Sequence, residues 1–80
     1  MTDEEALQRA RQAETIMGDP ALGAAFQDIE SHYVAIWKSS GPSEYELREE
    51  CHGQLWALAQ IQRQLRNYLE TGKLLSAASK

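Results

Sequence analysis

Residues 44–71 read EYELREECHGQLWALAQIQRQLRNYLET, and no other stretch of the chain is as long and as regular. Apolar side chains recur in it at alternating steps of four and three residues, which is the pattern of a helix that packs along one side against another helix. The predicted buried line consists of Leu47, Cys51, Gln54, Leu58, Ile61, Leu65 and Tyr68. Leu55 and Leu69 widen this line into a stripe. We therefore expect a helix over 44–71, with the rest of the chain packed against it.

A first helix is predicted over about 3–17. Thr2 is followed three residues later by Glu5, which is the pattern of a capping box at a helix start. The apolar side of this helix consists of Ala6, Ala10, Ala13 and Met17, again at four-three spacing. Alanines bury little area, so this helix is stable only where it lies close against another element.

A sharp turn is predicted at residues 18–20, followed by a second helix over about 20–38. Gly18 can end a helix in the left-handed conformation, Asp19 can cap the next helix, and Pro20 suits the first helical position. The seam of the second helix is Leu22, Phe26, Ile29, Tyr33 and Ile36, with Trp37 and Ala25 beside it. We expect Trp37 to be ordinary core.

Residues 39–43, SSGPS, break the helical pattern, and Ser43 with Glu46 forms a second capping box. So short a connection makes the two flanking helices antiparallel neighbours. Gly72 is expected to end the third helix. The sequence thus predicts an all-α single domain over 1–80, an antiparallel helical hairpin (about 20–38 and 44–71) with an additional N-terminal helix.

The third helix is predicted to be longer than the second by about nine residues, or ~13 Å. Because the loop joins the two helices at one end, the overhang carries Leu65, Tyr68 and Leu69. These side chains need cover, which either the first helix or another subunit could supply.

Trp56 is placed half a turn away from the Leu58–Leu65 line, on the same outer side as Tyr45. Large aromatic side chains dominate the energetics of protein interfaces. Either the first helix folds back over Trp56 or a second protein covers it. We predict a homo-oligomer, a dimer or larger, because closed symmetric dimers are the commonest way to bury such a surface. The predicted interface residues are Trp56, Tyr45, Leu65, Tyr68 and Leu69.

Composition excludes several classes of protein. With one cysteine, Cys51, the chain can form no internal disulfide, and we expect Cys51 to be a small buried apolar residue. A net charge of −4 argues against a nucleic-acid-binding surface. The acidic N-terminus is unlike a signal peptide, and no apolar run approaches the ~20 residues of a membrane span. We expect a soluble protein that is neither secreted nor bound to a membrane.

No residue pattern predicts a chemical reaction. His32, His52 and Cys51 lack the spacing of a metal site, and neighbouring positions on a helix point 100° apart. The acidic pair Glu49 and Glu50 is typical of a solvated helix surface. The sequence also lacks phosphate-binding and nucleophile motifs. We therefore expect a protein that is not an enzyme and that has no cofactor and no metal.

The chain resembles the small all-helical proteins of tailed bacteriophages and prophages, whose function is unassigned. The residues that carry the resemblance are Ile16–Pro20, Ala25–Phe26, Ile29–Glu30, Trp37, Arg48–Glu49, Leu55–Leu65 and Leu69–Lys73. The resemblance implies a phage setting, with the protein in the host cytoplasm or the virion. It transfers no catalytic or binding residue.

Three functions remain open from the sequence. The first is a non-enzymatic assembly or interaction protein that binds itself or a phage structural protein, such as a virion or morphogenesis accessory component. The second is an inhibitor that binds and blocks a host defence or regulatory protein. The third and weakest is a helical nucleic-acid-binding protein.

Overall fold

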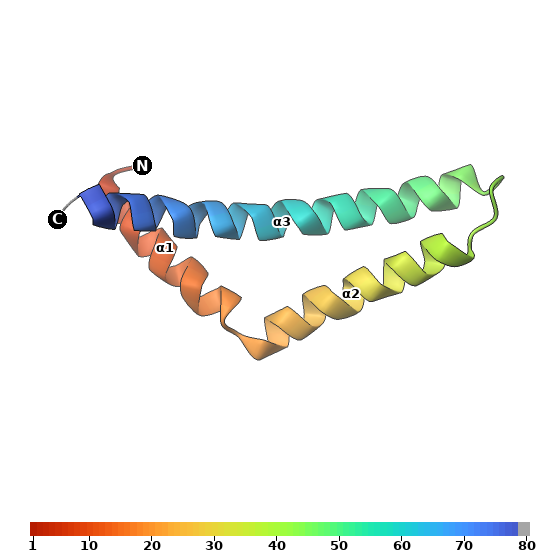
Figure 1. Ribbon diagram of the computed structural model, residues 1–80, viewed down its shortest axis with the longest axis horizontal. Coiled ribbons are helices and arrows are strands. Elements are labelled where there is room, and N and C mark those ends of the chain that lie inside the picture. Colours follow the sequence, from red (N-terminus) through yellow and green to blue (C-terminus); the bar gives the residue numbers. More distant parts are fainter. Residues whose placement is uncertain (79–80) are drawn as a thin grey trace.

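The computed structural model describes residues 1–78, which form three helices and no strand: α1 (Asp3–Met17), α2 (Pro20–Ser39) and α3 (Tyr45–Ala78). Figure 1 shows α1 and α2 one after the other along the same side of α3, with the N-terminus beside the end of α3 that is far from the hairpin loop. The predicted all-α hairpin with an added N-terminal helix is confirmed.

The Thr2 half of the predicted capping box forms at the start of α1, and Glu5 binds the Thr2 hydroxyl in place of its backbone N–H. The backbone N–H of Glu5 donates to Oγ1 of Thr2 over 3.2 Å, and the Thr2 hydroxyl donates to Oε1 of Glu5 over 3.1 Å. Together these bonds satisfy one of the N–H groups that the first turn of a helix leaves without a partner, and they hold the two side chains together. α1 covers the predicted residues 3–17.

The turn between α1 and α2, which we call the elbow, is held by Asp19. Its Oδ1 accepts hydrogen bonds from the backbone N–H groups of Ala21 and Leu22, over 2.8 Å and 3.2 Å. Pro20 occupies the first position of α2, where its missing N–H costs nothing. Gly18 does not adopt the expected left-handed conformation, because its φ and ψ are −85° and −3°. A right-handed turn ends α1 instead, and Pro20 prevents α1 from continuing into α2.

The hairpin loop is closed by Glu44 rather than by the predicted Ser43–Glu46 box. Oε1 of Glu44 accepts from the N–H of Gly41 over 2.9 Å, and the N–H of Glu44 donates to the Gly41 carbonyl over 3.1 Å. These two bonds join the same pair of residues from both sides. α3 therefore begins at Tyr45, one residue later than expected.

Gly72 does not end α3, which continues to Ala78. Gly72 is buried, and a Cβ built at this position would overlap the Cβ of Ala10 on α1. The absence of a side chain therefore lets α1 approach α3 closely, in the way that small residues allow between packed helices. The expected stop at Gly72 was wrong because the packing partner, and not the local backbone, requires glycine there.

The buried line of α3 follows a strict seven-residue repeat: Cys51, Leu58, Leu65 and Gly72 are each buried or half-buried. The second row of the seam is shifted by one residue from the prediction, and consists of the half-buried residues 55, 62 and 69. The predicted row at 54, 61 and 68 lies beside the seam, and Ile61 in it is 53% exposed. A seven-residue repeat is the pattern of helices that coil around each other with a left-handed twist.

The molecule is long and thin, with principal extents of 56 × 23 × 16 Å. Its radius of gyration is 17.0 Å, against about 12 Å for a compact domain of 80 residues. At almost every point along α3 a cross-section cuts α3 and only one of the other helices (Figure 1). Within residues 1–78, no helix is long and apolar enough to cross a membrane.

Candidate interaction surface

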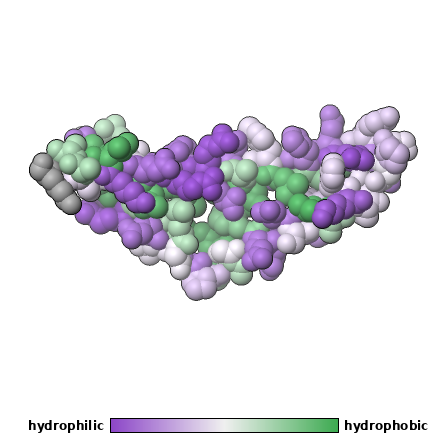
Figure 2. All heavy atoms as spheres, viewed as in Figure 1, coloured by the Kyte–Doolittle hydropathy of each residue, from purple (hydrophilic) through white to green (hydrophobic). Residues whose placement is uncertain are grey.

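A cleft lies beneath the elbow, where α1 and α2 diverge from α3. Its volume is about 530 Å³. Its apolar lining consists of Ile16, Met17, Leu22, Phe26 and Leu65, and its polar lining includes Gln27, Glu30, Ser31, Gln62 and Arg66. Figure 2 shows hydrophobic residues gathered around a hollow at this place, surrounded by hydrophilic ones. The elbow therefore leaves apolar side chains of all three helices open to solvent.

A second cleft of about 430 Å³ lies between α1 and α3. It is lined by Arg9, Gln12, Ala13, Thr15, Ile16, Leu65 and Tyr68. Ile16 and Leu65 line both clefts, so they separate two openings. Most of the exposed surface of the second cleft is apolar and comes from Ala13, Ile16, Leu65 and Tyr68. Exposed apolar surface of this kind is typical of sites that bind another protein.

Three of the predicted interface residues lie on the overhang, where α1 partly covers them. Leu65, Tyr68 and Leu69 are half-buried. The guanidinium of Arg9 on α1 lies 5.7 Å from the centre of the Tyr68 ring, close enough for a cation–π contact. The structure thus answers one of the open questions: the first helix runs over the overhang and does not fold back over Trp56.

The other two predicted interface residues, Trp56 and Tyr45, are exposed. Trp56 is 61% exposed and Tyr45 is 73% exposed. They are eleven residues apart on α3, or ~16 Å along its axis. Exposed polar residues, among them His52 and Arg63, lie on the same side between and beyond them. The two rings are therefore separate apolar points on a polar side of α3, and their role in an interface stays a prediction.

The exposed isoleucines were not predicted as interface residues. Ile16 and Ile29 are each 44% exposed, and Ile61 is 53% exposed. Ile29 and Ile61 were placed in buried seams, because the sequence cannot show that the elbow holds α2 away from the middle of α3. A signal was nevertheless present: the apolar stripe of residues 44–71 is wider than one partner helix can cover.

Trp37 was predicted to be core, but it is 43% exposed. The guanidinium of Arg48 on α3 lies over its ring, 4.6 Å from the ring centre. The long side chain of Arg48 thus covers a face of the Trp37 ring. This contact joins α2 to α3 near the hairpin loop.

The side chains that could carry chemistry are apart from one another. Cys51 is 1% exposed, as expected of a small buried apolar residue. His32 is exposed and lies edge-on to Tyr33, with ring centres 5.1 Å apart. Within the described part of the chain, no three His, Cys, Asp or Glu side chains are placed to hold one metal ion.

Comparison with known proteins adds no relative. No family model matches the chain, and neither a curated protein nor a solved structure matches it. The proposals that follow therefore rest on the surface of the chain itself.

Proposed function

We propose that this chain is a non-enzymatic assembly protein that acts by binding a second copy of itself. The supporting observation is its exposed area, which is 6222 Å². A folded monomer of 9.0 kDa exposes about 4,850 Å², so this chain exposes about 1,400 Å² more than its mass requires. An ordinary protein–protein interface covers about 800 Å² on each partner, and the interfaces of permanent homodimers are larger.

The small core supports the same proposal. Among residues 1–78, the apolar side chains that are nearly fully buried are Ala10, Ala13, Cys51 and Leu58. Three of these four are small, so their burial removes little apolar area from water. A chain of this length is already near the lower limit for a stable single core. Contact with another copy would cover further apolar surface and stabilise the fold.

The setting that we propose is a bacteriophage particle or its assembly, which rests on the sequence resemblance described above. A second candidate is an inhibitor that binds a host protein. The exposed Trp56 favours this candidate, because it lies on the side of α3 opposite to the seam and would stay exposed if two copies met elsewhere.

The mass of the protein in solution tests the proposal. Light scattering at increasing concentration should approach twice 9.0 kDa or a larger multiple, and helicity measured by circular dichroism should fall on dilution. A mass of one chain at every concentration up to the millimolar range would contradict self-association. Purified particles that contain the protein would favour the assembly role, whereas capture of one host protein by the free chain would favour the inhibitor.

A further inference from the structure

The two sides of the helical layer differ in composition. The second cleft brings Ile16, Leu65 and Tyr68 to one side. Ile61 precedes Tyr68 by seven residues and so lies on the same side of α3. We call this surface the isoleucine face, and it consists of Ile16, Ile29, Ile61, Leu65 and Tyr68.

Ile29 belongs to this face because of its position on α2. It is two residues from Gln27 and two from Ser31, and residues two apart on a helix point 200° apart. Gln27 and Ser31 line the first cleft and Ile29 does not, so Ile29 lies toward the opposite edge of α2 from these two residues, although Leu22, seven residues earlier, reaches the cleft. The isoleucine face therefore extends across all three helices.

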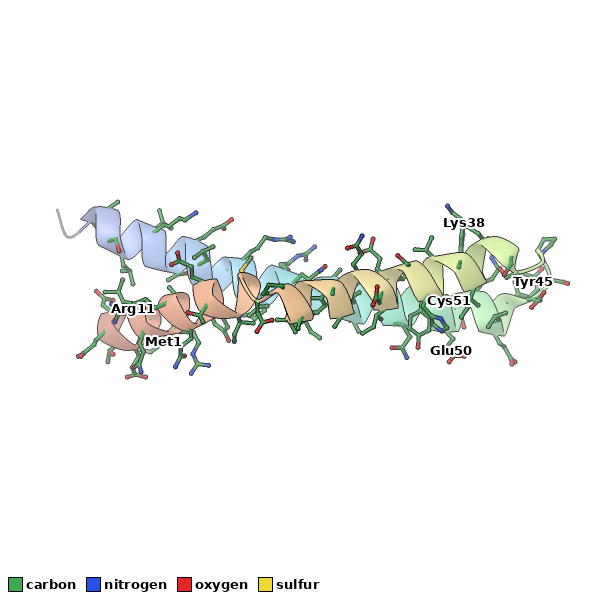
Figure 3. The ribbon with its side chains drawn as sticks, turned by 90° about the horizontal axis from the view of Figure 1, so that it is seen from below. Met1, Arg11, Lys38, Tyr45, Glu50 and Cys51 are labelled. Carbon is green, nitrogen blue, oxygen red and sulfur yellow. The ribbon has the colours of Figure 1, made fainter. Side chains whose placement is uncertain are left out.

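The opposite side of the layer carries the first cleft, and we call the polar part of its lining the polar face. Its residues are Gln27, Glu30, Ser31, Gln62 and Arg66. Figure 3 shows the two sides at the edges of the layer: Lys38, eleven residues after Gln27 on α2, points to one edge, and Glu50 points to the other. Glu50 precedes Tyr68 by eighteen residues, or five helical turns, and so belongs to the side of the isoleucine face.

We propose that a second copy of this chain covers the isoleucine face through a twofold axis perpendicular to that face. This inference rests on the proposed self-association and assigns it a surface and an orientation. In such a dimer, α1 and α3 of one copy lie over α2 and α3 of the other. Each cross-section then contains four helices in place of two, which is the smallest common arrangement of helices that encloses a core on all sides.

The area that the chain exposes agrees with this occupant. The excess over a compact monomer is about 1,400 Å² per chain, so a dimer would bury about 2,800 Å² in total, within the range of permanent homodimers. A small ligand in either cleft would leave Ile29 and Ile61 exposed, because neither residue lines a cleft. A second copy covers both.

The charges on the isoleucine side favour the antiparallel orientation. Arg9 lies at one end of it, against Tyr68. Glu50 lies at the other end, eighteen residues earlier on α3, or ~27 Å away. A twofold axis perpendicular to the face brings Arg9 of each copy next to Glu50 of the other. A parallel arrangement would instead place Arg9 beside Arg9 and Glu50 beside Glu50, and like charges repel. Complementary charges of this kind set the register of an interface.

The centre of the contact falls between Glu50 and Tyr68. The exposed residues there are Gln54, Ala57, Ile61 and Gln64, with Ala57 and Ile61 in the middle, one turn apart. Ala57 is small enough for the two α3 helices to approach each other, and Ile61 supplies the apolar contact. Because this axis pairs the level of Tyr68 with Glu50 of the other copy, it places Ala57 of each copy next to Ile61 of the other, which makes the geometry testable with a pair of cysteine variants.

Cysteine cross-linking and solution mass test the proposal together. Native Cys51 is 1% exposed, so the background from it should be low. An equimolar mixture of Ala57→Cys and Ile61→Cys should form a disulfide between the two variants under mild oxidation, and so should an equimolar mixture of Arg9→Cys and Glu50→Cys. The matched control is Trp56→Cys, which is more exposed than position 61 but lies on the outer side of α3.

Substitution gives the second measurement. Ile61→Asp should weaken dimerisation at least tenfold, while Gln27→Asp on the polar face should change it less than threefold. If Trp56→Cys cross-links and the mixture of Ala57→Cys and Ile61→Cys does not, or if Ile61→Asp dimerises like the wild type, the isoleucine face is not the contact, although self-association stands. If the wild-type chain is a monomer at all concentrations, the proposed function fails as well.

Discussion

α1 and α2 pack against the same helix, but α1 does so through alanines and α2 through large aromatic and branched side chains. Ala10 and Ala13 of α1 are 7% and 1% exposed. No residue of α2 reaches the same burial, although Phe26, Tyr33 and Ile36 all lie on its seam. The helix that is poorer in apolar side chains is therefore the better buried one.

Distance from α3 explains the difference. Alanines opposite Gly72 let α1 lie directly on α3, so small side chains are enclosed by backbone. Large side chains hold α2 farther away, and the elbow moves its first turns outward (Figure 1). The alanines of α1 are therefore buried within one chain, while the larger side chains of α2 stay partly exposed. The number of apolar residues in a helix therefore does not predict how completely that helix is buried in the monomer.

The largest expected effect is the loss of Leu58, which lies midway along α3, between the parts that α1 and α2 cover. Leu58 is 7% exposed. Leu58→Ala should lower the free energy of unfolding by about 2–5 kcal/mol, through lost burial and the cavity that remains. Urea unfolding at one fixed protein concentration measures it.

The matched control for this substitution is Leu74→Ala, because Leu74 is 72% exposed on the same helix. The control should change the free energy of unfolding by less than about 0.5 kcal/mol. Equal losses at both positions would show that the seam does not run through Leu58.

A smaller effect, with opposite signs at two sites, tests the close contact of α1. Gly72→Ala adds a methyl that overlaps Ala10, and overpacking of this kind costs about 1–3 kcal/mol. Gly53→Ala on the same helix meets nothing within 4 Å. It should stabilise the fold by about 0.5–1 kcal/mol, because alanine is the better helix former. Thermal unfolding followed by circular dichroism measures both.

The two glycine variants control each other, since the gain in helix propensity is the same at each site. If Gly72→Ala stabilises the chain as Gly53→Ala does, α1 does not lie against α3 at this point. The double variant Gly72→Ala with Ala10→Gly should recover part of the loss, because it removes the overlapping methyl from the partner helix.

Local patterns were enough to predict the helices, their order and most of their ends. The capping residues Thr2 and Asp19 form the bonds that the sequence predicts, because a cap is a contact among near neighbours in the chain. Gly72 was misread because a glycine required by a partner helix and a glycine that ends a helix look alike in one sequence. The contact with Ala10 joins residues 62 positions apart, which no local pattern contains.

The candidate surface was predicted only in part. Two rows of apolar residues were visible on α3, but their spacing cannot tell which row faces the chain's own helices and which faces outward. The structure assigns Leu55 and Leu69 to the inner rows and leaves Ile61 outside. The direction in which the chain turns at the elbow decides which row faces inward. That direction depends on how α1 and α2 pack against α3, which no local sequence pattern contains.

The smallest expected effect concerns the contact between Arg48 and Trp37, which joins α2 to α3 at the loop end. The guanidinium lies 4.6 Å from the ring centre, and a partly exposed cation–π contact contributes about 0.5–1 kcal/mol. Arg48→Met keeps much of the aliphatic length but removes the charge, so it should destabilise the fold by about that amount. Trp37 fluorescence, measured in a Trp56→Phe background, should report the change as the ring becomes more accessible to a neutral quencher.

The control for this last test is Arg63→Met, which removes the same charge from an exposed position on the outer side of α3. It should leave the accessibility of Trp37 and the free energy of unfolding unchanged within about 0.5 kcal/mol. If both variants behave alike, net charge and not the stacked contact is responsible. The contact lies at the loop end of the molecule, where α2 and not α1 packs against α3. Arg48→Met should therefore lower the protection of α2 amides from hydrogen exchange. Protection of α1 amides from hydrogen exchange should stay as in the wild type, since its alanine contacts with α3 are independent of the loop.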